Sequence, residues 1–448
     1  MIGANATVWV ALGSRPPGGP RKLKITCGAT SLTHYGGVYL LHRFFSRLRL
    51  RQVLPQEARL LQRNTRSRAG AMLLALRYPR LLGLDRSETT PLLRQNGVFQ
   101  SLPGLPSYPE APTLRRFLRR VAPGGLPRLR ALYDRLLHRM TVRPHPPTRL
   151  IFDVDATVRG LYGKHEGAKI GDNPSKRGRP SYHPLRCFEG RTKDFWHGEW
   201  RPGDAHTASG TLERFPACFA TLPAGVRSVS VRADKGVYDP TLGEWLEAHR
   251  ARCVMVARRT APITRTLPPR RYVSPSRGVE GAEFRDHPIR WPQPFRCVGI
   301  RRPQPEAPTE PLPRCKLGTY HSPVLVTNLP LQPLTRWRCY HDRAGVELLI
   351  KPLHGDYALG SIPTRHFFAN ETSFPLLLLA YNLVNWFKRL GLPPDLQNAT
   401  LQTLRHKILR LPAQLRRVEN RPSLTLPASG PREAAWRYAV PKIEKLNL

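Results

Sequence analysis

The feature that most constrains this chain is residues 149–157, RLIFDVDAT, where a run of large apolar residues leads into two carboxylates. A short apolar run rich in β-branched and aromatic residues predicts a buried β-strand. Asp153 and Asp155 stand two positions apart, so in a strand their side chains share one face. A buried carboxylate is costly unless a positive group meets it, and a divalent metal held by oxygen ligands is the simplest such group. The alternative is that Asp155 only caps a turn where the strand ends.

The second constraint is the charge of the chain. Its 448 residues include 72 Lys and Arg against 31 Asp and Glu, which gives a formal net charge of +41. A surplus of this size repels itself unless a polyanion screens it, so nucleic acid is the predicted partner and an anionic membrane surface is the rival. No apolar run reaches the roughly 18 residues of a membrane-spanning helix, and no Walker-type phosphate loop is present. Neither a membrane nor ATP is therefore expected.

Two further acids complete a pattern that begins at residues 149–157. Asp234 ends a β-branched run and is followed by Gly236, so it repeats a strand that ends in a carboxylate. Glu347 stands at i+7 from Tyr340 and i+4 from Arg343, and on a helix the three residues would fall within roughly 60° of one another. In that position the glutamate would reach a metal while the arginine binds a phosphate, although an ordinary surface face of a helix would show the same spacing.

The order of these acids indicates a class of fold. Two strand-end aspartates, an intervening insertion and a helical glutamate are what two-metal phosphoryl transfer on a ribonuclease H-like sheet requires. The expected fold class is therefore α/β: a ribonuclease H-like mixed sheet with flanking helices, interrupted by an insertion of loops and strands.

Residues 1–147 are expected to form a helical DNA-binding lobe, because apolar residues recur at helical spacing with arginines between them. A Pro-Gly-Gly break at 123–125 separates two short segments of this kind, which is typical of a helix-turn-helix. The alternative is a basic helical bundle whose arginines only face solvent. The candidate DNA contacts in this lobe are Arg115, Arg116, Arg119 and Arg120.

The remainder of the chain alternates strand and helix patterns. Residues 148–257 and 324–392 are expected to form the two halves of a catalytic core, separated by a Pro- and Arg-rich insertion at 258–323 and followed by a basic C-terminal tail at 393–448. Strands are expected at 195–200, 226–231, 252–257 and 324–327, and helices at 208–217, 240–249, 334–353, 374–390 and 401–417.

Several short motifs taken together resemble the transposases of bacterial insertion sequences, specifically DDE group 1, whose glutamate lies in a Y-x2-R-x3-E-x6-K signature. Tyr340, Arg343 and Glu347 match the first three positions of that signature. The resemblance covers about residues 150–390 and is specific as a set, although each piece alone is weak. The other matching pieces are YGKHEGA at 162–168, NP at 173–174, GRPSYHPL at 178–185, RAD at 232–234, FFANE at 367–371 and AYNL at 380–383.

The resemblance implies roles for named residues. Asp155, Asp234 and Glu347 would be the catalytic residues and would bind Mg²⁺ or Mn²⁺, with Asp153 as the alternative first ligand. Tyr340 and Arg343 would position the DNA backbone near the cut.

The resemblance also implies partners and an activity. The partners would be double-stranded DNA, the terminal inverted repeats of the protein's own element and, on DNA, a second copy of the chain. The activity would be that of an endonuclease that also transfers strands, in the cytoplasm and associated with the nucleoid.

Four departures from the family pattern leave other functions open. Ala156, Asp172 and Lys235 replace the usual residues, and His354 stands at the lysine position of the signature, close after Pro352. The alternatives are a structure-selective ribonuclease H-like nuclease, which would cleave without joining, and a transposase-derived DNA-binding protein that has lost catalysis.

Overall fold

The structure is a computed structural model. It describes residues 7–11, 22–26, 31–50, 53, 69–84, 90–94, 96, 108–143, 145–171, 173, 176–205, 211–258, 261–267, 272–276, 279–286, 295–303, 316–317, 320–321, 323–343, 352–357, 359, 362–418, 421–427 and 430–447. In this part of the chain no helix is long and apolar enough to cross a membrane.

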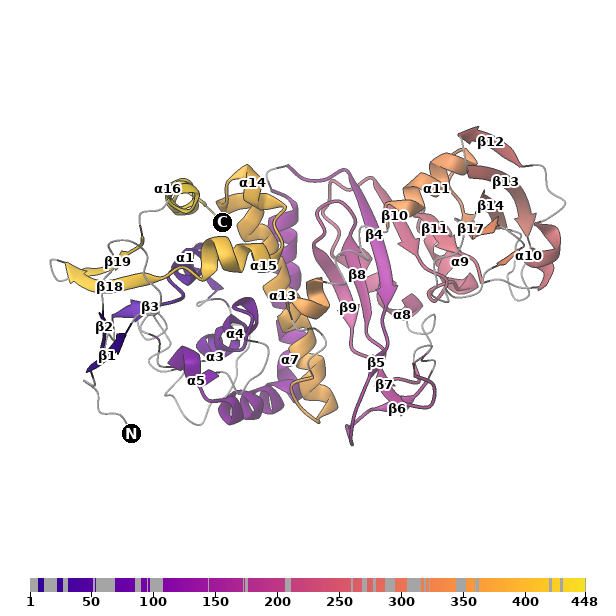
Figure 1. Cartoon of the computed structure of the whole chain (residues 1–448). Helices are drawn as coiled ribbons and strands as arrows, with labels where there is room; N and C mark the ends of the chain where they lie inside the picture. Colours follow the sequence, from indigo (N-terminus) through magenta and orange to yellow (C-terminus); the bar gives the residue numbers. More distant parts are fainter. Residues whose placement is uncertain are drawn as a thin grey trace.

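A mixed sheet forms the centre of the protein (Figure 1). Over the described residues it has 11 strands, and its main path runs β12-β13-β14-β17-β11-β10-β4-β8-β9. The strands of the first half of the core are β4 (Arg149–Ala156), β8 (Leu185–Glu189), β9 (Phe195–Glu199), β10 (Ser228–Ala233) and β11 (Arg252–Val256). Strand β4 is antiparallel to β8 and parallel to β10, which is parallel to β11.

Helical crossovers explain the parallel strands, because a parallel connection needs a long return path. Helix α8 (Thr211–Ala220) leads to β10, and helix α9 (Pro240–Ala248) joins β10 to β11. Asp239 begins α9 by accepting hydrogen bonds from the backbone of the next turn. The strands and helices expected between residues 195 and 257 are confirmed to within a few residues at each end.

The insertion extends the central sheet. Its strands are β12 (Val273–Ser276), β13 (Val279–Asp286), β14 (Phe295–Pro303), β15 (Lys316–Leu317) and β16 (Tyr320–His321), with the short helix α10 (Ala261–Thr266) before them. Strand β14 pairs with β17 (Val324–Thr327), which pairs with β11. The insertion is therefore continuous with the core through hydrogen-bonded strands.

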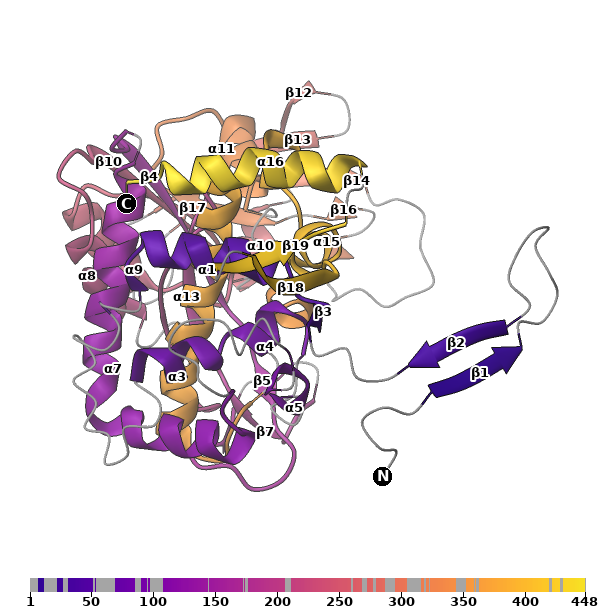
Figure 2. The ribbon, with the colours of Figure 1, turned by 90° about the vertical axis from the view of Figure 1, so that its left-hand side faces the viewer.

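Helix α7 (Ala111–Thr141) contradicts the predicted helix-turn-helix. It is one helix of 31 residues that passes through the Pro-Gly-Gly sequence. Figure 2 shows that it bends along its length, as expected when a proline removes a backbone donor and crowds the preceding turn. The proline bends the helix without ending it, because apolar residues on both sides, such as Leu118 and Leu129, are buried in the same core.

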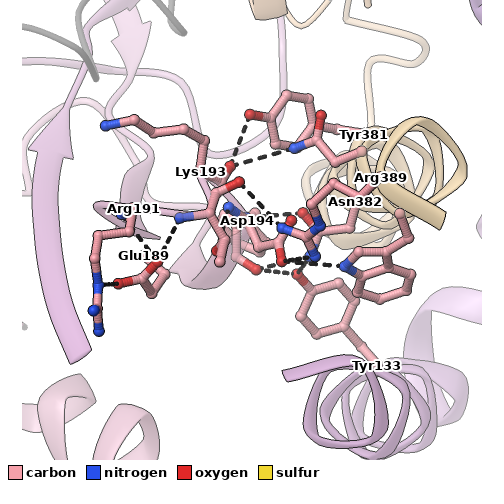
Figure 3. A network of polar contacts seen from close by, with 12 residues as sticks. Tyr133, Glu189, Arg191, Lys193, Asp194, Tyr381, Asn382 and Arg389 are labelled. Carbon is pink, nitrogen blue, oxygen red and sulfur yellow. Dashed lines mark hydrogen bonds and ion pairs between the residues drawn. The ribbon is translucent and has the colours of Figure 1, made fainter. Parts of the chain in front are cut away.

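Helix α13 (Phe367–Gly391) packs beside α7, between the sheet and the helices of the chain ends (Figure 1). It confirms the helix expected at 374–390. A buried polar network fixes it to the turn between β8 and β9 (Figure 3). The Asn382 amide accepts from the backbone nitrogen of Phe195 at 2.8 Å and donates to the Tyr133 hydroxyl of α7 at 2.6 Å, while Arg389 pairs with Asp194 at 2.8 Å. The AYNL motif thus has a structural role in this protein.

The two ends of the chain fold together. Helix α1 (Val38–Arg47) contacts α16 (Gly430–Glu444), and strand β3 (Leu32–Thr33) pairs with β18 (Ala413–Val418), which pairs with β19 (Arg421–Thr425). The other described elements near the N-terminus are α3 (Ala69–Ala75), α4 (Tyr78–Leu81), α5 (Thr90–Arg94) and a separate hairpin of β1 (Thr7–Ala11) and β2 (Lys22–Thr26), which projects in Figure 2.

Two predicted helices are wrong in part. The C-terminal one ends early: α14 (Pro394–Gln397), α15 (Leu401–Leu404) and the π-helix η2 (Arg405–Leu409) precede Pro412, and the chain then forms a strand. Proline lacks the backbone donor that would continue the helix. Of the helix expected at 334–353, the structure describes α11 (Pro333–His341), which is followed by a turn at 342–343, and a helical segment that begins at 352. Residues 344–351 lie outside the described part.

Candidate active site

Asp153, the alternative first ligand, is enclosed by an arginine. Its two carboxylate oxygens accept hydrogen bonds from Arg232 Nε at 2.6 Å and Nη2 at 2.7 Å, and both side chains are buried. Burial raises the pKa of Asp153, and the Arg232 guanidinium opposes that rise. Arg232 also donates to the backbone oxygen of Cys339 at 2.8 Å, which attaches the end of α11 to the sheet. The positive group that meets Asp153 is therefore a side chain of the protein.

Asp155 lies at the end of β4 between two arginines. Arg186 Nη2 is 2.7 Å from its Oδ2, and Arg343 Nη2 is 3.3 Å from its Oδ1. Thr157 donates a further hydrogen bond to Oδ2 at 3.0 Å. The residue is only 7% exposed, so these charge-assisted contacts offset its loss of water.

Asp234 follows β10. Ala233 is paired with Val154 across the parallel strands, so Asp234 and Asp155 are the next residues of the two strands in the same register. Its Oδ1 accepts from the backbone nitrogens of Gly236 at 3.0 Å and Val237 at 3.3 Å, which forms the turn after the strand. Burial raises the pKa of Asp234, Arg343 lowers it, and the nearby Asp155 carboxylate raises it again. The structure thus places two of the predicted acids together.

Arg343 is the residue that joins the two carboxylates to the segment containing the Y-x2-R-x3-E motif. It is buried, follows α11, and donates to the backbone oxygen of Val154 at 3.2 Å as well as to Asp155. Tyr340, one turn earlier, packs against the apolar cluster of Val254, Val298, Ile300, Leu325 and Leu329. Glu347 lies outside the described residues, so its predicted approach to the two aspartates stays a prediction.

Arg186 is a residue of this site that sequence reasoning missed. It is fully buried on β8, directly opposite Asp155 in the antiparallel register. Burial lowers its pKa, whereas Asp155 raises it. The available signal was one arginine within the apolar strand LRCFE, because a charged residue in a buried strand requires a partner.

The four arginines predicted to bind DNA lie on the N-terminal half of α7. Three of them are exposed, namely Arg116, Arg119 and Arg120, and Arg115 is half-buried. They lie on a different element from the acids, and their contact with DNA stays a prediction.

Comparison with known proteins identifies the family. The model of the family "Transposase DDE domain group 1" matches residues 15–448. The chain belongs to this DDE transposase family. A solved structure of a piggyBac transposase synaptic complex with hairpin DNA is similar at 12% sequence identity, with a TM-score of 0.42, over 84% of this chain and 80% of that chain. The comparison with curated proteins gave no match.

DDE transposases generally use a divalent metal ion. In the part of this transposase that the structure describes, no three His, Cys, Asp or Glu side chains form a group that could hold one. The two acids present could serve as ligands: Asp155 and Asp234 carry carboxylate oxygens at the ends of adjacent strands, Asp155 is buried and Asp234 is half-buried, and the negative charge of Asp155 raises the pKa of Asp234. A cation between them would remove that repulsion.

Proposed function

We propose that this protein is a transposase that cleaves DNA and transfers strands to move its own insertion sequence. One observation carries the proposal: Asp155 and Asp234 lie side by side at the ends of parallel strands β4 and β10, with Arg343 directed at the first of them. The strand order β9-β8-β4-β10-β11, antiparallel in its first three strands and parallel in its last three, supports the proposal of a ribonuclease H-like core.

The residues of the candidate site have distinct roles in this proposal. Asp155 and Asp234, with Glu347 as the third acid, would hold Mg²⁺ or Mn²⁺. The metal ions supply a nucleophile at neutral pH and stabilise charge on the phosphodiester oxygens. Arg186 and Thr157 orient the Asp155 carboxylate, and Arg343 offers its guanidinium to a DNA phosphate when the substrate enters.

Asp155, rather than Asp153, is proposed as the first ligand. Both oxygens of Asp153 are engaged by the same guanidinium, and its side chain is completely buried. Asp155 also has an arginine at each oxygen, but its contact with Arg343 is 3.3 Å long and its side chain lies at the strand end, next to Asp234. Moving Asp153 to a metal would leave Arg232 as a buried, unpaired charge, which is strongly unfavourable.

The test uses the full chain, Mg²⁺ and a duplex made from the DNA that flanks the gene, since that DNA would carry the terminal repeats. Wild-type protein should nick the duplex and produce joined strands. Asp155→Asn, Asp234→Asn and Glu347→Gln should each abolish cleavage while retaining DNA binding. Glu433→Gln, on the distant helix α16, is the matched control and should remain active.

The alternatives have their own outcomes in this assay. Cleavage without joined products would show a nuclease. Binding without any Mg²⁺-dependent product from the wild-type chain would show a DNA-binding protein that has lost catalysis. Two copies of the chain on paired ends, seen as a protein–DNA complex of doubled stoichiometry, are expected because transposition must join two ends.

A further inference from the structure

His354 stands at the position where the family signature has lysine, and the structure shows what it contacts. Its Nε2 lies 2.8 Å from Nη2 of Arg159, on the short strand β5 (Arg159–Gly160). A guanidinium can only donate hydrogen bonds, so His354 Nε2 must be the acceptor and carries no proton there. The cation at this place in the molecule is therefore Arg159.

Arg159 has no carboxylate partner among the described residues to balance its charge. It is half-buried, and its hydrogen bond in this part of the chain goes to the neutral His354 ring. Burial lowers its pKa to about 10, and the neighbouring Arg186 acts in the same direction. A half-buried guanidinium that lies near a second guanidinium and has no acid beside it is a site that an anion would stabilise.

Arg186 provides the second, independent observation. Its Nη2 is used by Asp155 and Thr157, but its Nε and Nη1 are buried and have no hydrogen-bond partner in the described part of the chain. Leaving two buried donors of a charged group unsatisfied is costly. Arg186 thus adds positive charge beside Arg159, while its own free donors are enclosed, so the donors that can meet an incoming acceptor oxygen are those of the half-buried Arg159.

We propose that Arg159, positioned by His354 and flanked by Arg186, forms a phosphate-binding subsite next to the catalytic acids. Its ligand is a phosphodiester of the DNA strand being processed, whose oxygens match the planar donors of a guanidinium. Arg159 thereby supplies the positive charge that the signature lysine would have carried. The proposal deepens the proposed function and rests on it for the identity of the strand.

The decisive variant is Arg159→Gln. A glutamine amide still donates to His354 Nε2 but carries no charge, so the structural role is kept while the attraction for a phosphate is removed. The measurement is DNA binding by the full chain in EDTA as a function of salt, with a duplex of the flanking DNA and a duplex of arbitrary sequence. Arg437→Gln, which removes an arginine whose side chain is 79% exposed on α16, is the matched control.

Arg159→Gln should weaken binding about tenfold and lower the slope of log K against log salt by about one, as expected when one phosphate is no longer neutralised. Arg437→Gln should change neither value. In the Arg159→Gln background, His354→Lys should restore the slope, because lysine returns a cation to the same place. If Arg159→Gln changes binding no more than Arg437→Gln does, the subsite is refuted.

Two variants test whether His354 positions Arg159. His354→Gln keeps an acceptor for Arg159 and should bind DNA as wild type does. His354→Ala removes the acceptor and should partly reduce the slope of log K against log salt. Because these experiments measure binding without metal, they separate the two proposals. A wild-type chain that cleaves flanking DNA while Arg159→Gln binds normally would refute only the subsite. A chain that never cleaves, but shows the altered slope, would refute only the transposase activity.

Discussion

Arg232 and Asp153 are register partners on neighbouring parallel strands, and each carboxylate oxygen accepts one guanidinium hydrogen bond. Removing one partner leaves a buried charge without compensation, so Asp153→Asn and Arg232→Met should each lower the free energy of unfolding by about 3–5 kcal/mol. Chemical denaturation measures this loss. The double variant Asp153→Leu/Arg232→Met should recover most of it, since apolar residues of similar volume often replace a buried pair without penalty.

Asp153 should be needed for stability but not for DNA cleavage. At a temperature where Asp153→Asn is still folded, it should retain Mg²⁺-dependent cleavage, whereas Asp155→Asn should show none. The reverse result, with Asp153→Asn inactive and Asp155→Asn active, would move the first metal ligand to Asp153.

Asp234 should make the stability of the metal-free protein depend on pH. Burial and Asp155 raise its pKa above the ordinary 3.8, so the folded state keeps a proton that the unfolded chain has already lost. Stability is therefore lost as the pH rises from 3.8 through the raised pKa. Asp234→Asn should melt at a higher temperature than wild type at about pH 7 without metal, and the difference should vanish at low pH.

Mg²⁺ should raise the melting temperature of the wild-type chain above that of Asp234→Asn, because only the wild type keeps both acids of the proposed metal site. Magnesium at about 100 times its dissociation constant stabilises a folded protein by about 2.7 kcal/mol, so the wild-type melting temperature should rise. Asp234→Asn should show little rise, and Asp395→Asn, an exposed acid on α14, should respond as wild type does. An equal rise in all three proteins would remove Asp234 from the metal site.

The network around Asn382 should be essential for stability. Asn382→Leu leaves the Tyr133 hydroxyl and the buried backbone groups of Phe195 with fewer partners, each costing about 1–3 kcal/mol. A loss of about 2–4 kcal/mol is expected by chemical denaturation. Tyr133→Phe should cost less, and its effect should not add to that of Asn382→Leu, because both residues belong to one network. Additive losses would show that the two side chains act independently.

The arginines on the outer face of α7 should contribute to DNA affinity. Arg116→Ala, Arg119→Ala and Arg120→Ala combined should reduce the slope of log K against log salt by about 0.9 for each phosphate that is no longer neutralised. The melting temperature should fall little, because substitutions at a solvent-facing helix surface rarely change stability much. If the triple variant binds as tightly and with the same slope as wild type, DNA contacts lie elsewhere.

Residue patterns predicted the core better than the ends of the chain. Strands β4, β10 and β11 could be predicted because apolar, β-branched runs report burial directly, and two acids at strand ends mark a site. The Arg232–Asp153 and Asp155–Arg186 contacts could not, since they depend on which strands are neighbours and in what register. The sequence shows that a buried acid needs a cation but does not show which cation meets it.

Two prolines led to wrong predictions, one of a helix break that is absent and one of a helix that ends earlier than expected. Pro123 indicated a break in α7, yet burial on both sides of it keeps the helix continuous. Pro412 lay inside an expected helix and in fact precedes a strand, because β18 pairs with β3 near the other end of the chain. Such long-range pairing has no signature in local periodicity, so residues 413–418 could not be recognised as a strand.

The pairing of β3 with β18 and the packing of α1 on α16 also set an order of events during synthesis. Arg43 and Arg47 both bond to Glu444, which follows them by 401 and 397 positions. Helix α1 therefore leaves the ribosome long before the residues that complete its packing have been made, since Glu444 follows Arg43 by 401 positions and contacts distant in sequence form last. A translation product cut short before β18 would contain every residue of the proposed metal site. It would still lack β18, which pairs with β3, and α16, which packs on α1.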